Sequence, residues 1–333
     1  MSDEIFPSPA IYSTDTPDFV LFDFDIGTDG SCADSATLEP IPSGYKWLHL
    51  DAHAEGVREF LVADTTIDNI AERNLLADDS RPRTIAHGND VLINLRGVNL
   101  NPGSEPEDMV GVRIFIEPTR ITTMERRPLR AVRDLAEKAR AQTLPRTPGG
   151  FIAMLALTII DRMNPTIADL NEQVDELEEK IDNMNADSGR ADLAEIRRES
   201  ILLRRYLAPQ RDALNTLALQ DMDWITEDNR LRIREAADQA TRITEELEAI
   251  RERCAIVHDG LVDKRSEEMN RNMMILSVVA AIFLPLGLVS GMMGINVGGM
   301  PWVDSANGFW IVSGIVVVTG FLQLLVFKLL KWI

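Results

Sequence analysis

Two long apolar runs without a charged residue constrain this chain most, because they lie close together at its C-terminal end. Residues 272–303 and 305–327 carry no charge, and Met273–Met293 and Phe309–Phe327 within them are each long enough to cross a bilayer. A helix rises about 1.5 Å per residue, so about 20 residues span a hydrocarbon core of roughly 30 Å. We therefore expect two transmembrane helices, over 273–293 and 308–328, that form a hairpin on a large polar domain.

The distribution of charge separates this hairpin from the rest of the chain. The net charge is −19, yet five basic and three acidic residues lie from Lys264 onward, so residues 1–263 carry −21. A domain this acidic repels nucleic acid and attracts cations. Basic residues flank the outer ends of the hairpin, including the tail 329–333, and its connecting loop 294–307 has none. The positive-inside rule then predicts that both termini lie in the cytoplasm and the loop 294–307 lies outside.

The N-terminal end and the cysteines indicate no secretion. Residues 1–16 are polar and rich in proline, without a basic segment followed by an apolar run, so we expect a loose arm and no signal peptide. Cys32 and Cys254 lie far apart in the sequence, and they suggest no disulfide framework.

Residues 17–145 have the pattern of a cytosolic α/β domain. Short runs rich in β-branched and aromatic residues predict strands, and helical patterns separate them. The expected strands are Phe19–Phe24, Trp47–Leu50, Val91–Val98, Val110–Ile116 and Arg120–Met124, and the expected helices are Glu55–Ala63, Ile67–Ala77 and Leu129–Gln142.

Residues 146–226 predict an acidic helical hairpin. From Ile152 to Met184, apolar residues recur at alternating spacings of three and four, which is typical of one long helix. Asp187-Ser188-Gly189 is expected to break it, and apolar residues from Leu193 to Leu207 carry a second helix back. The tip of this hairpin is rich in carboxylates, which form either a solvated surface or a fringe that concentrates cations.

A long helix is expected over 227–293, running into the first apolar run without a turn signal. Its apolar seam extends from Ile233 to Leu261 at the same alternating spacing. Such a helix would be roughly 100 Å long at 1.5 Å per residue. A seam that continues into a bilayer favours packing against copies of itself, and several parallel rods would enclose an axial path. The alternative is that the small hairpin is only an anchor.

One face of the first apolar run combines neutral, small and weakly polar residues. Small residues allow helices to approach closely in lipid, so this face is either a packing seam or the lining of a channel. A channel of this kind would pass a hydrated cation, and Met273 and Leu284 would close it by excluding water. The residues expected on this face are Asn270, Met273, Leu276, Ser277, Ala280, Leu284, Gly287 and Gly291.

The loop after the first run offers uncharged oxygen atoms. Gly294, Gly298 and Gly299 permit backbone conformations with positive φ, and Asn296 supplies a side-chain carbonyl. A ring of such carbonyls favours a hydrated divalent ion at the outer mouth. Turns use the same residue types, so the loop alone is a weak signal.

The position of Gly294-Ile295-Asn296, directly after the first of two C-terminal spans, resembles the CorA family of divalent-cation channels and transporters. The family's usual tripeptide is Gly-Met-Asn preceded by Tyr, and here Met293 and Ile295 replace the Tyr and the Met. Gly-Ile-Asn-Val-Gly-Gly-Met-Pro is more similar to the ZntB branch, which is associated with zinc. Segments 80–83 (Ser-Arg-Pro-Arg) and 204–212 (Arg-Arg-Tyr-Leu-Ala-Pro-Gln-Arg-Asp) agree with that branch, whereas Trp302 stands where a further glycine is usual.

This resemblance implies a funnel-shaped homopentamer whose pore is lined by the first span, with Asn296 at the entrance. Met273, Leu276 and Leu284 fall where the family places hydrophobic constrictions. The implied activity is Zn²⁺ transport coupled to H⁺, with Mg²⁺, Ni²⁺ or Co²⁺ as the alternative cargo. The implied partners are further copies of the chain, the lipid bilayer and the ion, with no cofactor and no nucleic acid. A more distant alternative is a membrane-anchored binding or sensor protein.

Other candidate metal ligands are sparse. Cys254 and His258 are four residues apart on the long helix, and nitrogen and sulfur ligands suit zinc. His49, Asp51 and His53 follow a predicted strand and offer a metal site or a hydrolase site. The chain has no nucleophile motif and no phosphate-binding loop, so we expect no enzymatic activity.

Overall fold

The structure is a computed structural model of the whole chain, and it describes residues 17–35, 43–64, 67–77, 81–180, 186–295, 301–302 and 305–330. The chain divides into two compact units, Met1–His258 and Asp259–Ile333. The long helix α7 (Glu227–Gly294) contributes residues to both.

The first unit is built on a mixed β-sheet. Its strands are β1 (Val20–Ile26), β2 (Cys32–Asp34), β3 (Tyr45–Asp51), β4 (Arg83–His87), β5 (Asp90–Gly97), β6 (Val110–Glu117) and β7 (Arg120–Glu125). Within the described residues they form one sheet in the order β2-β1-β3-β7-β6-β5-β4. Five of them lie where the sequence predicts strands, whereas the two edge strands β2 and β4 are not predicted.

A parallel pairing joins two antiparallel halves of this sheet. β3 runs parallel to β7, with Trp47 opposite Ile121 and His49 opposite Thr123. The other pairs that the structure describes are antiparallel. A parallel pair needs a long crossover connection, and the chain between β3 and β7 provides it with two short helices and the strands β4, β5 and β6.

These two helices, α1 (Val57–Ala63) and α2 (Asn69–Leu76), cover one face of the sheet. The Asp68 carboxylate accepts the backbone N–H groups of Ile70 and Ala71, and so satisfies donors that the first turn of α2 leaves open. The apolar core beneath the helices comprises Phe19, Val20, Leu48, Leu50, Val57, Leu61, Ile67, Ala71, Leu75, Leu92, Phe115 and Met124.

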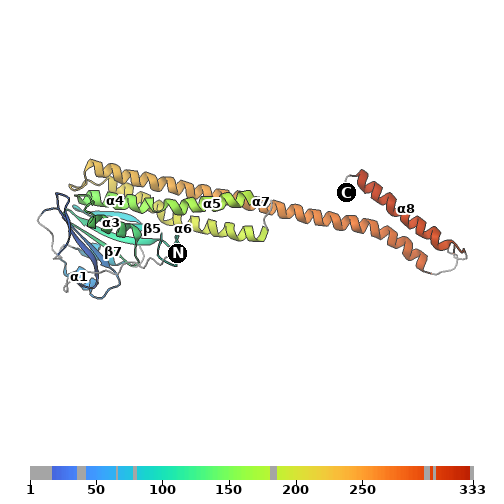
Figure 1. Ribbon diagram of the computed structural model, residues 1–333, viewed down its shortest axis with the longest axis horizontal. Coiled ribbons are helices and arrows are strands. Elements are labelled where there is room, and N and C mark those ends of the chain that lie inside the picture. Colours follow the sequence, from blue (N-terminus) through green and yellow to red (C-terminus); the bar gives the residue numbers. More distant parts are fainter. Residues whose placement is uncertain are drawn as a thin grey trace. The chain divides into compact units, whose positions relative to one another are not determined.

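The opposite face is covered by α3 (Arg130–Arg140) and α4 (Pro148–Asp161), as Figure 1 shows. α4 begins after Thr147, whose hydroxyl accepts the Gly150 N–H at 3.1 Å. Its fully buried Phe151 packs edge-on against Trp47 of β3, with ring centroids 4.8 Å apart. Because burying one large apolar side chain stabilises a fold by about 1.5–3 kcal/mol, this contact is a principal link between α4 and the sheet.

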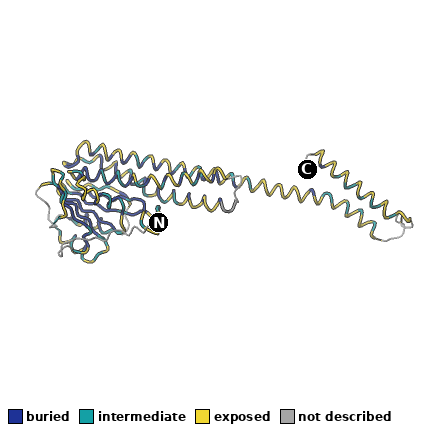
Figure 2. The backbone as a smooth tube through the Cα atoms, in the orientation of Figure 1, coloured by how far each residue is buried: buried dark blue, intermediate teal, exposed yellow. Residues whose placement is uncertain are grey.

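The remaining helices of the first unit are α5 (Asn164–Lys180), α6 (Ala186–Ala218) and the first part of α7. Figure 2 shows buried and exposed residues alternating along them. The predicted seam of α7 is buried within the single chain from Ile233 to Val257. This part of the seam is therefore already filled, and it does not by itself require a second copy.

Two sequence-based expectations for this region are wrong. The single helix expected from Ile152 to Met184 is interrupted, because α4 ends at Asp161 and α5 begins at Asn164, next to Pro165. Proline lacks a backbone N–H and is accommodated in the first turn of a helix. The break expected at 187–189 is also wrong, since these residues belong to α6.

The second unit contains the end of α7 and the helix α8 (Gly308–Leu329), which lie side by side (Figure 1). Gln323 Nε2 of α8 donates to the Ala281 carbonyl at 3.4 Å. Gly320 leaves room for Leu286, whose Cδ1 would be 3.6 Å from a Cβ at this glycine. α7 continues as a helix through Pro285, so the proline does not end it.

Candidate functional site

Three helical segments in the described part of the chain are long and apolar enough to cross a membrane: Pro148–Lys180, Glu227–Gly294 and Gly308–Leu329. The first is half buried inside the first unit, whereas only 6% and 0% of the apolar windows of the other two are buried. Large apolar surfaces exposed on one chain mark contact with lipid or with partner proteins. The two poorly buried segments are therefore the candidates for membrane spans, as the charge-free runs predict.

The apolar end of α7 has two distinct faces. The less exposed residues lie on the side of α8 and include Val278, Ile282 and Val289. Leu284 follows Ile282 by two residues, which is about 200° around the helix axis. Leu284 is 70% exposed, so α8 leaves this face of α7 uncovered.

All residues predicted to line a pore lie on this uncovered face or beside it, and each is exposed in the single chain. A Cβ placed at Gly287 or Gly291 would meet no atom within 4 Å. The face is thus available to further copies of the chain, to water or to lipid. Its members are Asn270, Met273, Leu276, Ser277, Ala280, Leu284, Gly287 and Gly291.

The predicted selectivity loop is described only at its edges. α7 ends at Gly294, and the Ile295 side chain is exposed, whereas Asn296, Gly298 and Gly299 lie outside the described residues. Trp302 has a φ of 64°, in the left-handed region that bulky side chains rarely adopt. The tryptophan thus keeps the kind of backbone conformation that glycine adopts freely.

Cys254 and His258 have different surroundings in the single chain. Cys254 is 2% exposed and packs in the seam of α7, while His258 faces solvent. Burial raises the pKa of the Cys254 thiol and disfavours the thiolate that metals bind. The neighbouring Arg253 contacts Asp175 and Glu178 of α5, so two carboxylates of the acidic hairpin are paired within the chain.

His49, Asp51 and His53 do not converge either. The fully buried His49 has its Nδ1 2.8 Å from Thr123 Oγ1 and its Nε2 3.3 Å from Glu125 Oε2. Burial lowers the pKa of this imidazole, which favours its neutral form. Asp51 accepts the backbone N–H of the exposed His53. Among the described residues no group of three or more His, Cys, Asp or Glu side chains is placed to hold a metal ion.

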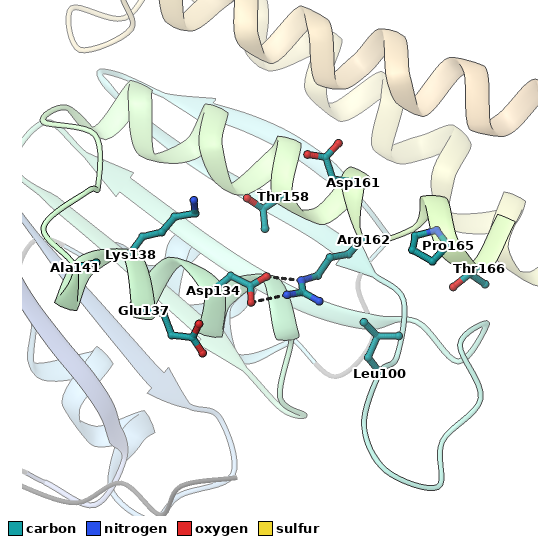
Figure 3. Close-up of a pocket in the computed structure, with 10 residues that line it drawn as sticks. All are labelled: Leu100, Asp134, Glu137, Lys138, Ala141, Thr158, Asp161, Arg162, Pro165 and Thr166. Carbon is teal, nitrogen blue, oxygen red and sulfur yellow. Dashed lines mark hydrogen bonds and ion pairs between the residues drawn. The ribbon is translucent and has the colours of Figure 1, made fainter. Parts of the chain in front are cut away.

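A groove of about 670 Å³ lies along α3, the end of α4 and the start of α5 (Figure 3). The Arg162 guanidinium reaches across it to the Asp134 carboxylate, with Nη2 2.6 Å from Oδ1. Lys138, Glu137 and Asp161 also line the groove. Charges of both signs are interspersed there, so the groove has the character of a helix junction held by an ion pair.

A buried charge cluster at β1 and β3 has no counterpart in the sequence-based expectation. The Lys46 side chain is 0% exposed, and its Nζ lies 2.7 Å from Asp25 Oδ1 and 3.3 Å from Asp23 Oδ1. Burial raises the pKa of Asp23 to about 6, although the Lys46 charge acts in the opposite direction. The acidic residues of β1 alternate with Phe22 and Phe24 in the sequence, but the pairing of β1 with β3 is needed to place Lys46 between them.

The exposed apolar segments of α7 and α8, which follow the α/β unit along the chain, indicate a membrane protein. Residues 42–329 match the family described as CorA-like Mg²⁺ transporter protein. The chain therefore belongs to this family of divalent-cation transporters, and the resemblance drawn from its loop and arginine-rich segments is confirmed.

Relatives of known name are similar over most of the chain. The divalent cation transporter CmaX of Pseudomonas aeruginosa is 37% identical over 300 residues, which cover 90% of each protein. The zinc transport protein ZntB of Pectobacterium carotovorum is 32% identical over 79% of this chain and 80% of its own. The CorA magnesium transporter of Methanocaldococcus jannaschii has a TM-score of 0.83 over 94% of this chain and 98% of its own, at 17% identity, and shows that the fold is shared.

Proposed function

We propose that this chain carries divalent metal cations, with zinc favoured, through an axial pore formed by several copies around their α7 helices. The observation that carries the proposal is the uncovered face of α7, which is neutral, partly small and exposed over Asn270–Gly291. Because a lone two-helix hairpin cannot enclose a path for solutes, this face needs other copies of itself to form a conduit. A homopentamer in the inner membrane, with both termini cytoplasmic and α8 toward the lipid, is the arrangement we favour.

The absence of charge on this face favours a hydrated ion as the cargo. A carboxylate in the pore would trap a divalent cation, whereas amide and carbonyl oxygens contact its water shell without holding it. Asn296 at the outer mouth is the residue we assign to this contact, together with the backbone of Gly294, Gly298 and Gly299. Met273 and Leu284 are the apolar constrictions. A membrane potential of 100 mV supplies about 4.6 kcal/mol for the inward passage of two charges, at about 2.3 kcal/mol per charge.

Zinc is favoured over magnesium because the loop Gly-Ile-Asn-Val-Gly-Gly-Met-Pro is similar to that of the zinc-associated branch, and a protein named for zinc transport is among the relatives. A relative named only as a divalent cation transporter leaves Mg²⁺, Ni²⁺ and Co²⁺ as alternatives. We propose that H⁺ accompanies the ion and that no resident cofactor takes part.

The test is radiolabelled zinc uptake into proteoliposomes by Asn296→Ala, with Asn307→Ala as the matched control in the same loop. We expect Asn296→Ala to abolish uptake while the oligomer remains intact in detergent, and Asn307→Ala to transport at the wild-type rate. Comparing Zn²⁺, Mg²⁺, Ni²⁺ and Co²⁺ with and without a pH gradient identifies the cargo and the proton coupling. Unchanged uptake in Asn296→Ala would refute its role and favour the membrane-anchored sensor.

A further inference from the structure

A second pocket, of about 460 Å³, lies between α6 and α7 and is lined by Arg204, Arg205 and Arg251. We call it the arginine pocket. Its volume falls within the range of small-molecule sites, roughly 300–1,000 Å³. It belongs to the first unit and is separate from the hairpin that carries the proposed pore.

The arginine pocket is positive in a part of the chain that is otherwise strongly acidic. Glu248 contacts both Arg204, at 3.1 Å from its Nε, and Arg251. Arg205 lies over the Tyr206 ring and forms no ion pair with a residue that the structure describes. Glu248 therefore pairs with two of the three guanidinium groups and leaves Arg205 without an ion pair among the described residues, although residues 1–263 as a whole carry a charge of −21. Like charges gathered in this way repel one another unless an anion joins them.

The walls of the arginine pocket are held in place from behind. The Arg96 guanidinium of β5 lies 4.2 Å from the centroid of the Tyr206 ring of α6. The backbone N–H of Arg96 donates to Oε1 of Gln210, also on α6, at 2.6 Å. These contacts fix α6 against the sheet. Leu247 is buried beneath the pocket, and Ile201 exposes 48% of its surface at the rim. Because α6 is held in this way, the backbone that carries Arg204 and Arg205 need not rearrange when the pocket binds a ligand.

We propose that the arginine pocket binds a small molecule that carries a phosphate group. The planar guanidinium group presents two parallel N–H donors to phosphate oxygens, and hydrogen bonds between ionised partners are the strongest of their kind. Arg205 is available to the phosphate directly. Arg204 and Arg251 both pair with Glu248, but each guanidinium group has further N–H donors that remain for a second phosphate oxygen. The apolar rim at Ile201 suits a ligand with a non-polar part next to its phosphate.

The test uses the full-length protein in detergent, stripped of metal with a chelator, and isothermal titration with inorganic pyrophosphate at low ionic strength. We expect saturable binding with one site per chain. Arg205→Gln should weaken it about tenfold or more, because the variant loses a charged donor to the phosphate oxygens. Arg205 makes no ion pair in the described part of the fold, so this variant tests the pocket without disturbing Glu248.

Two further variants sharpen the result. Glu248→Gln removes the competing carboxylate and should bind pyrophosphate more tightly than the wild type. Arg234→Gln is the matched control, since Arg234 is an exposed arginine of α7 outside the pocket, with 47% of its side chain exposed against 46% for Arg204. It should bind as the wild type does.

The proposal is overturned by absence of binding to the wild type, by equal losses in Arg205→Gln and Arg234→Gln, or by Glu248→Gln binding no more tightly than the wild type. Absence of binding would be the outcome if a second copy of the chain fills the pocket.

Discussion

The buried cluster at Lys46 predicts that Asp23→Asn stabilises the protein at neutral pH. Burial raises the pKa of Asp23 from 3.8 to about 6. At pH 7 the carboxylate must be ionised in an environment that favours its neutral form, and asparagine has nearly the same shape without the charge. A shift of about two pKa units corresponds to about 3 kcal/mol, at 1.36 kcal/mol per unit. Asp23 is buried, so solvent screening reduces this figure little.

The direction of the pH dependence follows from proton binding. Between about pH 4 and pH 6 the folded chain holds a proton on Asp23 that the unfolded chain releases. This contribution to stability is complete below the unfolded pKa, and it is lost as the pH rises through the folded pKa. Asp23→Asn should therefore match the wild type near pH 4 and exceed it progressively up to pH 7.

The assay is the melting temperature of the full-length protein in detergent across this pH range. One kcal/mol shifts the melting temperature of a domain of 150–250 residues by about 2–4 °C, so the difference at pH 7 should reach several degrees. Asp25→Asn is the control, because it removes the carboxylate 2.7 Å from the buried Lys46 Nζ and should destabilise the fold at neutral pH. Parallel pH profiles for the wild type and Asp23→Asn would refute the reasoning.

Three other perturbations test the rest of the structure. Trp302→Gly should be more stable than Trp302→Ala by about 1–2 kcal/mol in free energy of unfolding, because only glycine adopts a φ of 64° without strain. Trp302→Gly should therefore have the higher melting temperature, and equal melting temperatures would contradict this. A Cβ at Gly149 would lie 2.6 Å from two neighbouring atoms, so Gly149→Ala should lose about 1–3 kcal/mol in thermal melting while Gly111→Ala, with 3.8 Å of room, changes little. Leu284→Ser should raise ion leak in proteoliposomes by wetting the proposed constriction, whereas Leu286→Ser, on the α8 side, should not; equal leak in both would count against the assigned pore face.

The sequence predicts the elements whose burial is continuous. β3, β5, β6 and β7 are nearly buried throughout, and most of their residues are apolar, β-branched or aromatic, which is a strong signal. The same holds for the seam of α7, whose spacing of three and four matches its buried residues. The transporter class could be predicted as well, through the resemblance of the loop and the arginine-rich segments to a known family.

The expectations that fail depend on position in the fold. The edge strands β2 and β4 are mostly exposed, so they lack an apolar pattern, and only pairing with a neighbour makes them strands. The break between α4 and α5 is hidden because Met163 continues the apolar spacing through it and is itself fully buried. The arginine pocket and the Lys46 cluster bring together residues from separate elements, and local spacing does not encode such proximity.

The parallel pairing of β3 with β7, here called the sheet seam, has a consequence for how the chain folds. Each antiparallel half of the sheet forms from strands that are near neighbours in the sequence, but the sheet seam requires Asp51 and Glu125 to meet after the whole intervening crossover is ordered. Contacts of such long sequence separation form late and slowly. The polar side chains buried at this seam, Thr123 and His49, hydrogen-bond only when both halves are in register. We therefore expect registration of the two halves to be a late step in folding, because a misaligned pairing leaves these polar groups buried without partners.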